Sequence, residues 1–348
     1  MSKVLNHVVI QTAFLGDLFL AIPLLKKLKE LFPADQIILV CKAGLGDYFL
    51  TEKLVDQVVE VRKNHRESYV AALAKLNSLE IGNLFCVHRS TRSLLLSLQI
   101  KAKAKIGFKS LLGYFVFNQR LEYKKSWPEA LRQLWILSSI DQDLQKKLLQ
   151  SDWSELNKVS AEGYLPQLPP EFASKNNSSI TTKRIAIFPG SVWATKKWTE
   201  VGFSELAAYF LEQGYEVFLM GGPDEKVVCE GIKQRVPNCI INAGDKTISQ
   251  SVEFIKTCSL VICNDSAPTH MAASQNVPVL TIFGPTTLNL GFRPWTSNAM
   301  VVQNTNLSCR PCGKHGHQKC PLGHHHCMTR ISSQAVISAA NLLLKVKN

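Results

Sequence analysis

The chain has 348 residues, of which 46% are hydrophobic, and its 40 Lys and Arg against 27 Asp and Glu give a net charge of +13. This length can bury two hydrophobic cores, and no apolar run reaches the ~18–20 residues that a membrane-spanning helix needs. The charge favours an anionic partner, yet no helix-turn-helix, zinc-finger spacing or aromatic ribonucleoprotein strand indicates nucleic acid. A phosphorylated lipid or nucleotide therefore ranks above nucleic acid as the partner.

Strands and helices alternate along residues 1–165. Short apolar runs predict strands at residues 4–12, 36–40, 57–61, 83–88 and 105–108. Segments with helical periodicity lie at residues 18–31, 67–79, 91–100 and 127–149. This alternation is typical of a parallel sheet covered by helices, so we expect residues 1–165 to form an amino-terminal Rossmann-like domain.

A second array follows a polar segment. Residues 166–183 are rich in Pro, Ser and Asn and predict a linker. The alternation restarts over residues 184–330, and residues 331–348 hold an amphipathic helix that we expect to pack back toward the amino-terminal domain. The fold class is therefore α/β, with two doubly wound Rossmann-like domains facing across a cleft.

Two polar turns place acidic residues after predicted strands, at the edge where parallel sheets bind ligands. In the first turn Asp17 follows Gly16 at the start of a helix. A carboxylate there could act as a general base toward a sugar hydroxyl, or it could simply cap the helix. In the second turn Asp224 and Glu225 could accept hydrogen bonds from ribose hydroxyls, or they could favour the start of the next helix.

The turn that opens the second array is suited to a diphosphate. Gly190 lets a ligand approach the backbone, Ser191 and Thr195 supply hydroxyls, and Lys196 or Lys197 supplies positive charge. The turn is not a Walker loop, because the chain contains no GxxxxGK[ST] sequence. By itself this turn is a weak signal.

Residues 259–287 are the most informative segment, a strand–turn–helix–strand unit. Asp265 and His270 lie where the first strand stops and the helix starts, and the free N–H groups of a helix start can hold an anion. The alternative is that Asp265 or Ser266 caps the helix while His270 packs on the strand.

Four motifs together resemble glycosyltransferase family 9, the ADP-heptose:lipopolysaccharide heptosyltransferases. They are FLGDLFLAIPLLKKLK, FPGSVWATKKW, MGGPDE and NDSAPTHMAA, in the family's order and spacing along nearly the whole chain. The segment SCRPCGKHGHQKCPLGHHHCM is most similar to the branch that adds the second inner-core heptose. The resemblance implies a GT-B architecture and an inverting transfer that needs no metal cofactor.

The resemblance also implies substrates and a location. The donor would be ADP-heptose, and the acceptor would be the heptosyl-Kdo-lipid A inner core of lipopolysaccharide. The enzyme would be a cytoplasmic monomer, peripheral on the inner face of the Gram-negative inner membrane. An amino end without the apolar core or cleavage site of a signal peptide agrees with that location.

Roles follow residue by residue from the resemblance. It implies that Asp17 takes the proton from the acceptor hydroxyl and that Lys196 meets the donor phosphates and stabilises the departing ADP. Asp265 would hold hydroxyls of the donor sugar, and the N–H groups that follow it would hold the diphosphate. Pro223 stands where some relatives carry a Glu that contacts the nucleoside. The expected donor-binding set is Gly190, Ser191, Thr195, Asp224, Glu225, Asp265, Ser266, Ala267 and His270.

Two further groups of residues can each be interpreted in more than one way. Cys309, Cys312, Cys320 and Cys327 with their neighbouring His residues could bind tetrahedral zinc. Their spacing is short for a zinc ribbon, so we expect no structural metal. The alternatives are reduced thiols in a loop over the cleft, or adventitious metal binding by His324–His326. The basic residues Lys101, Lys103, Lys105 and Lys109 are candidates for contact with the acceptor and with an anionic membrane surface, or they are ordinary solvated lysines.

Other functions stay open from the sequence. A transferase for the first heptose or for another sugar would share the family's motifs. A nucleotide-sugar epimerase of the same two-domain architecture would turn over the donor without an acceptor. A non-catalytic nucleotide- or nucleic-acid-binding protein would use the basic surface without chemistry, and it would not need Asp17.

Overall fold

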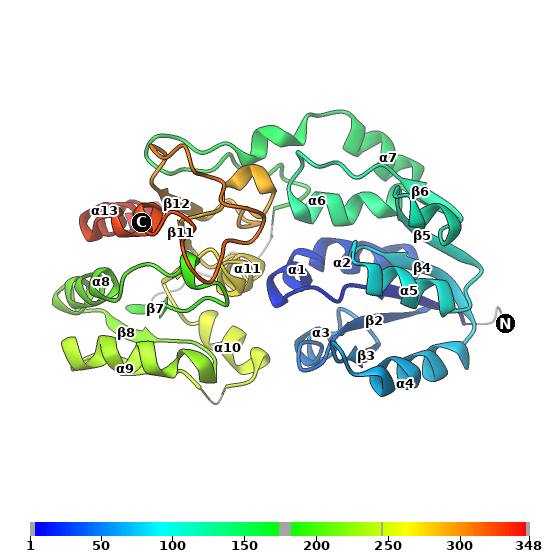
Figure 1. Ribbon diagram of the computed structural model, residues 1–348, viewed down its shortest axis with the longest axis horizontal. Coiled ribbons are helices and arrows are strands. Elements are labelled where there is room, and N and C mark those ends of the chain that lie inside the picture. The colour runs from blue at the N-terminus through cyan, green and yellow to red at the C-terminus, as the bar shows by residue number, and fades with distance from the viewer. Residues whose placement is uncertain (1–3, 174–181, 245, 346–348) are drawn as a thin grey trace. The chain divides into compact units, whose positions relative to one another are not determined.

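The computed structural model describes residues 4–173, 182–244 and 246–345. The chain divides into two compact units, Met1–Trp153 and Ser154–Asn348. Each unit is built on one sheet of six strands, all paired in parallel, with helices on its faces (Figure 1). In the described residues no helix is long and apolar enough to cross a bilayer.

The first unit holds β1 to β6 and α1 to α7. Its strands are β1 (Asn6–Ile10), β2 (Gln36–Lys42), β3 (Gln57–Val61), β4 (Ile81–Cys86), β5 (Ala104–Phe108) and β6 (Gln119–Leu121). Its helices are α1 (Leu15–Leu20), α2 (Ile22–Leu31), α3 (Asp47–Thr51), α4 (Arg66–Asn77), α5 (Thr91–Gln99), η1 (Leu112–Phe115), α6 (Glu129–Leu134), η2 (Trp135–Ser139) and α7 (Gln142–Leu149).

The second unit holds β7 to β12 and α8 to α13. Its strands are β7 (Arg184–Phe188), β8 (Glu216–Leu219), β9 (Ile240–Ile241), β10 (Leu260–Asn264), β11 (Val279–Phe283) and β12 (Ala299–Gln303). Its helices are η4 (Ala194–Lys196), α8 (Glu200–Glu212), η5 (Pro223–Glu225), α9 (Lys226–Arg235), α10 (Ile248–Ile255), α11 (Ala267–Ser274), η6 (Leu288–Leu290), α12 (His326–Thr329) and α13 (Ser333–Lys345). Between the two sets, η3 spans Trp153–Asn157.

The strand order gives each sheet one topological switch point. The first sheet runs β3-β2-β1-β4-β5-β6, so the chain builds outward from β1 and then returns to place β4 on the other side of β1. The second sheet runs β12-β11-β10-β7-β8-β9, and its reversal lies between β7 and β10. Ligands of open α/β sheets bind outside the carboxyl ends of the strands at such points. Ligand sites are therefore expected at the carboxyl ends of β1 and β4 and at those of β7 and β10.

The boundary between the units differs from the one that the sequence predicts. Residues 154–165, assigned to the amino-terminal domain, belong to the second unit, as do residues 166–168 of the predicted linker. Tyr164 bridges to Met300, and the Leu168 N–H donates to Ser297 Oγ at 2.9 Å. The predicted linker thus starts later than residue 166, and its residues 174–181 lie outside the described residues.

Two helical segments can be compared with their predictions. The helix expected over residues 127–149 is interrupted, because Asp141 caps a new helix and accepts a hydrogen bond from the Leu144 N–H at 2.9 Å. The carboxy-terminal helix α13 contacts α8, β10, β11 and β12. Its buried residues, among them Val336 and Ala340, join the core of the second unit. The buried face of α13 therefore packs within the second unit.

Arg293 connects the first residues of the second unit to the rest of that unit. The side chain is fully buried, and its guanidinium donates to the carbonyls of Leu156 and of Pro166, the latter at 2.9 Å, and more weakly to Thr296 O at 3.4 Å. Replacing Arg293 with Met would leave these carbonyls buried without a donor. Unsatisfied groups of this kind are costly, so we expect Arg293→Met to lower the free energy of unfolding by about 3 kcal/mol.

Urea denaturation would measure this loss. The control is Arg235→Met, because Arg235 is 55% exposed and its 3.4 Å pair with Glu200 lies on the surface, where ion pairs contribute less than about 1 kcal/mol. Equal stability of the two variants would show that the Arg293 hydrogen bonds do not hold the segment in place.

Candidate active site

Asp17 lies at the switch point of the first sheet, in the first turn of α1, the helix that follows β1. The Phe14 N–H donates to Asp17 Oδ2 at 3.2 Å, so the carboxylate does cap α1. The Gln133 amide donates to the Asp17 carbonyl at 3.1 Å and accepts from Gln11 Nε2 at 3.1 Å. Helix α6 therefore supports α1 through Gln133, and two helices fix the position of Asp17.

Burial and a neighbouring ion pair shift the pKa of Asp17. Glu129 Oε2 and Arg132 Nη2 lie 2.7 Å apart, and both side chains are buried. Burial and, after it, the negative charge of Glu129 raise the pKa of Asp17 from 3.8 to about 7. Burial also raises the pKa of Glu129, although Arg132 opposes this. A carboxyl group whose pKa lies near neutrality is suited to accept a proton at physiological pH.

The other side of the same switch point carries neutral hydrogen-bonding groups that the sequence analysis missed. Thr12 Oγ1 lies 2.9 Å from His88 Nδ1 and 3.0 Å from Ser93 Oγ. His88 follows β4, and burial, aided by Arg92, lowers its pKa to about 4, so the ring is neutral. The sequence could have indicated His88, because this residue ends a predicted strand and polar residues at strand ends are candidates for ligand contact. Neutral hydroxyl and imidazole groups of this kind can contact the hydroxyls of a sugar.

In the second unit, Asn264 ties the loop after β7 to the end of β10. Its side-chain amide donates to the carbonyls of Pro189 at 2.8 Å and Gly190 at 3.1 Å. Its Oδ1 accepts from the Trp198 N–H at 2.9 Å. Asn264 is fully buried, so these bonds fix the loop over the switch point. The sequence analysis did not select Asn264, although it stands next to Asp265.

Lys196 and Asp265 are brought together by that loop. Lys196 Nζ lies 2.6 Å from Asp265 Oδ2, and the same oxygen accepts a hydrogen bond from Thr286 Oγ1 at 2.6 Å. The lysine side chain is 13% exposed and the aspartate side chain 6%, so the ion pair is largely removed from solvent. Both residues were predicted for the donor site, in separate roles. The structure makes them partners of each other.

Helix α11 starts beside this ion pair. Ser266 is its N-cap residue, but its Oγ accepts no hydrogen bond from the helix and instead donates to the Asn264 carbonyl at 3.2 Å. Ala267 is the first residue of the helix, in which His270 lies one turn further on. His270 is buried, and its Nδ1 has no hydrogen-bond partner among the described residues. Burial lowers the pKa of His270 to about 4, so the ring is neutral. A buried nitrogen without a partner indicates that something outside the chain satisfies it.

The two acidic residues after β8 have different environments. The Glu225 carboxylate accepts from the Gly222 N–H at 2.5 Å and lies against Gly190, where a methyl group would collide with it. Gly190 is thus required by Glu225, not only by a ligand. Asp224 is exposed on the surface. Of the two candidates for the nucleoside, only Glu225 adjoins the loop after β7.

The sequence analysis expected the Thr195 hydroxyl to be available to the donor, but this hydroxyl is already bonded within the chain. The Thr195 hydroxyl and N–H contact the carbonyl of His317 at 2.8 and 3.0 Å, and the His325 ring nitrogen lies 2.8 Å from the Thr195 carbonyl. The segment 304–328 therefore covers the loop after β7. Ser191 is also buried, and its Oγ accepts from the Trp193 N–H at 3.4 Å.

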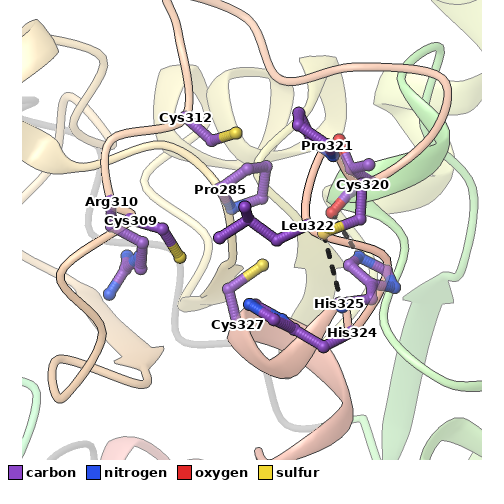
Figure 2. Close-up of a pocket in the computed structure, with 11 residues that line it drawn as sticks. Pro285, Cys309, Arg310, Cys312, Cys320, Pro321, Leu322, His324, His325 and Cys327 are labelled. Atoms are coloured by element: carbon purple, nitrogen blue, oxygen red, sulfur yellow. Dashed lines mark hydrogen bonds between the residues drawn. The ribbon is translucent and has the colours of Figure 1, made fainter.

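The four cysteines of this segment line one cavity together with Pro285, Leu322 and His325 (Figure 2). In Figure 2 the Leu322 side chain stands among the sulfur atoms. Among the described residues no three His, Cys, Asp or Glu side chains come close enough to hold a metal ion. The zinc set of Cys309, Cys312, Cys320 and Cys327 is therefore not assembled. The segment instead lies over the loop after β11, where Arg310 Nη2 donates to the Thr286 carbonyl at 2.8 Å.

The four lysines proposed for the acceptor are not equivalent. Lys103 Nζ pairs with Glu80 at 2.8 Å, and Lys105 Nζ donates to the Leu98 carbonyl at 2.9 Å. Lys101 and Lys109 are exposed. The last two are thus the better placed to meet an anionic ligand.

Comparisons with known proteins point to one family of enzymes. A model of glycosyltransferase family 9 (heptosyltransferase) matches residues 85–323. Lipooligosaccharide heptosyltransferase 2 of Campylobacter jejuni is 25% identical over 95% of this chain and 96% of its own length. Lipopolysaccharide heptosyltransferase 2 of Escherichia coli is 23% identical over 97% of each chain.

Solved structures show the same fold. The glycosyl transferase of family 9 from Veillonella parvula matches with a TM-score of 0.77 and 21% identity over 99% of each chain. The E. coli ADP-heptose lps heptosyltransferase II matches with a TM-score of 0.74 and 21% identity, again over 99% of each chain. The predicted α/β class, with two doubly wound parallel sheets in a GT-B architecture, is confirmed.

Proposed function

Because the chain belongs to glycosyltransferase family 9, the heptosyltransferase family, we propose that it adds the second heptose to the inner core of lipopolysaccharide. The donor is ADP-heptose, and the acceptor is heptosyl-Kdo-lipid A. The observation that carries the proposal is that relatives named heptosyltransferase 2 match the chain over nearly its whole length. In this chain the motifs that contain Asp17, Lys196 and Asp265 follow β1, β7 and β10, at the switch points where ligands of such sheets bind.

The donor diphosphate is assigned to the start of α11 and to Lys196. Lys196 already lies in a dry environment beside Asp265, and the first N–H groups of α11 add positive potential. The unpartnered Nδ1 of His270 is a further contact for the donor. Asp265 then holds hydroxyls of the donor sugar through its second carboxylate oxygen, and Glu225 contacts the nucleoside.

The chemical step is a single displacement. Asp17 accepts the proton of the acceptor hydroxyl while that oxygen forms a bond to the anomeric carbon of the donor heptose. The bond from the anomeric carbon to the phosphate oxygen breaks, and ADP leaves with its electron pair. Attack from the side opposite to ADP inverts the anomeric configuration. The positive charge of Lys196 stabilises the departing diphosphate, an effect of the kind that contributes about 3–4 kcal/mol in a preorganised site.

The acceptor carries its sugars on lipid A, so the enzyme has to work at a membrane surface. The proposed place is the inner face of the Gram-negative inner membrane, with the protein peripheral to it. The excess of basic residues favours the anionic lipid surface. Lys101 and Lys109 are candidates for contact with the acceptor head group, because both are exposed, whereas the exposed Lys103 pairs with Glu80.

An assay with three substrate mixtures would test the proposal. Purified protein is incubated with ADP-heptose and heptosyl-Kdo-lipid A, with ADP-heptose and Kdo-lipid A, or with ADP-heptose alone, and the products are weighed by mass spectrometry. Gain of one heptose only in the first mixture supports the proposal. Transfer to Kdo-lipid A would assign the first heptose instead, conversion of the donor alone would indicate an epimerase, and donor binding without turnover would indicate a non-catalytic protein.

A further inference from the structure

The first unit exposes an unusual group of apolar side chains on the connection from β5 to β6. This connection, residues 109–118, is called the apolar crossover below. It contains the single 3₁₀ turn η1 and carries four large apolar residues on its outer side. Leu111 is 85% exposed and Phe115 is 76% exposed, and Leu112 and Tyr114 are each more than half exposed. Four adjacent side chains of this size are not needed by the core, so their exposure calls for a partner.

Residues other than the four exposed apolar ones hold the crossover in place. The ring of Phe117 is buried and lies against Gly107 of β5, where a side chain would collide with it. Gly113 is buried over the same ring, and its N–H donates to Ser110 Oγ at 3.0 Å. Arg120 Nη1 donates to the carbonyls of Tyr114 and Phe117, each at 3.0 Å. The backbone of the crossover is therefore supported, and its apolar side chains are presented outward.

Helix α5 extends the apolar surface. The connections β4–α5–β5 and β5–crossover–β6 both step outward in the same direction along the sheet, so right-handed crossing places α5 and the crossover on the same face. The shared core confirms this, since Leu96 and Ile100 near the end of α5 belong to the same buried cluster as Phe117. Leu95 and Leu98 of α5, on the same face of the sheet, are about half exposed.

The chain segment that forms this patch carries charge of one sign. Residues 81–121 contain seven Lys and Arg and no Asp or Glu. The acidic residues that border this stretch, Glu80 and Glu122, pair with Lys103 at 2.8 Å and with Lys124 at 3.1 Å. Lys101 and Lys109 are exposed, and the Arg120 guanidinium lies 4.5 Å from the Tyr114 ring centroid. An apolar centre with a basic border is the pattern of a segment that lies in the interface of an anionic bilayer.

We infer that the apolar crossover inserts Leu111, Leu112, Tyr114 and Phe115 into the interface of an anionic phospholipid bilayer, while the basic residues around it contact the lipid head groups. This inference rests on the proposed function, because a lipid-linked acceptor requires the enzyme to work at a bilayer. It goes beyond the lysine contacts proposed from the sequence, because it makes apolar insertion the main source of binding. A second copy of the chain is a poorer occupant, since two such basic borders would repel each other.

Vesicle flotation would test the inference without any sugar substrate. The variant Leu111→Ser/Phe115→Ser and the wild type are mixed with vesicles of phosphatidylethanolamine and phosphatidylglycerol, at low and at high salt. We expect the variant to lose at least about tenfold in the partition coefficient, because two apolar side chains no longer leave water. We also expect wild-type binding to weaken with salt without disappearing, because only its electrostatic part is screened.

The matched control is Val70→Ser/Leu149→Ser, which removes two apolar side chains of the same unit that are 56% and 55% exposed. It should float like the wild type. Equal melting temperatures would show that each variant is folded. Turnover of a deacylated, water-soluble acceptor should be unchanged in Leu111→Ser/Phe115→Ser, whereas KM for acceptor embedded in vesicles should rise.

Two results would overturn the inference. One is flotation of Leu111→Ser/Phe115→Ser equal to that of the wild type. The other is a wild-type dimer in sedimentation velocity that becomes a monomer in this variant, which would assign the patch to a second copy. Because flotation uses neither donor nor acceptor, loss of vesicle binding would support the inference even if heptose transfer were not found. Heptose transfer with unaltered flotation would leave the proposed function standing without the inserted crossover.

Discussion

Replacing Asp17 with Asn is expected to lower kcat by at least ~10²-fold while leaving the affinity for ADP-heptose nearly unchanged. The substitution removes a proton acceptor that is needed in the transition state but keeps the shape of the side chain. Steady-state kinetics and donor titration would measure the two effects. Asp47→Asn is the control, because Asp47 is also an acidic residue in the first turn of a helix of the same unit and has no proposed chemical role.

Near-normal turnover of a folded Asp17→Asn protein would leave Asp17 as a helix cap alone. The pH dependence gives a second criterion. Because only the ionised carboxylate can accept a proton, kcat/KM should rise with pH and reach a plateau above about 7, the pKa of Asp17. Glu129→Gln removes the neighbouring negative charge, so the rise should move to lower pH. A rise that stays in place would show that another group titrates.

The same pKa predicts how the stability of the fold depends on pH. The pKa of Asp17 is higher in the folded chain than the 3.8 of an ordinary aspartate, so ionisation of Asp17 opposes folding. Below about pH 4 the group is protonated in both states and has no effect. As pH rises from 4 to 7 the wild type should therefore lose stability relative to Asp17→Asn, and the difference should then stay constant.

The positions of the site residues follow from the sequence because strand ends are easy to find. Apolar runs ending in polar turns locate Asp17 after β1 and Asp265 after β10, and parallel pairing brings such ends to one edge. The contacts among these residues do not follow in the same way. The pairing of Lys196 with Asp265 depends on how Asn264 anchors the loop after β7, and that requires the register of β7 against β10.

Contacts between residues far apart in the sequence explain most of the differences between the predictions and the structure. Thr195 looks like a free hydroxyl in sequence, but its partner His317 lies 122 positions later. The unit boundary falls after Trp153 rather than after residue 165 because Arg293 reaches back to Leu156 and Pro166. Neither partner is marked by a local pattern, so only the folded chain reveals them.

Replacing Lys196 with Ala is expected to weaken ADP binding and to lower kcat by roughly 10²–10³-fold, because the lysine meets phosphate charge in both the ground state and the transition state. The substitution has a second consequence. Lys196 is also the buried partner of Asp265, and removal of one partner leaves the other charge without compensation in a dry environment. We therefore expect a loss of about 3 kcal/mol in the free energy of unfolding as well.

The double variant Lys196→Ala/Asp265→Asn separates these two effects. Asparagine is neutral and can still accept the hydrogen bond of Thr286, so the double variant should recover most of the stability. It should not recover ADP affinity or turnover, because the positive charge at the phosphates is still missing. Lys197→Ala should behave like the wild type in all three measurements. If ADP affinity and turnover return together with stability, Lys196 serves only to neutralise Asp265, and the phosphates are held by the start of α11 alone.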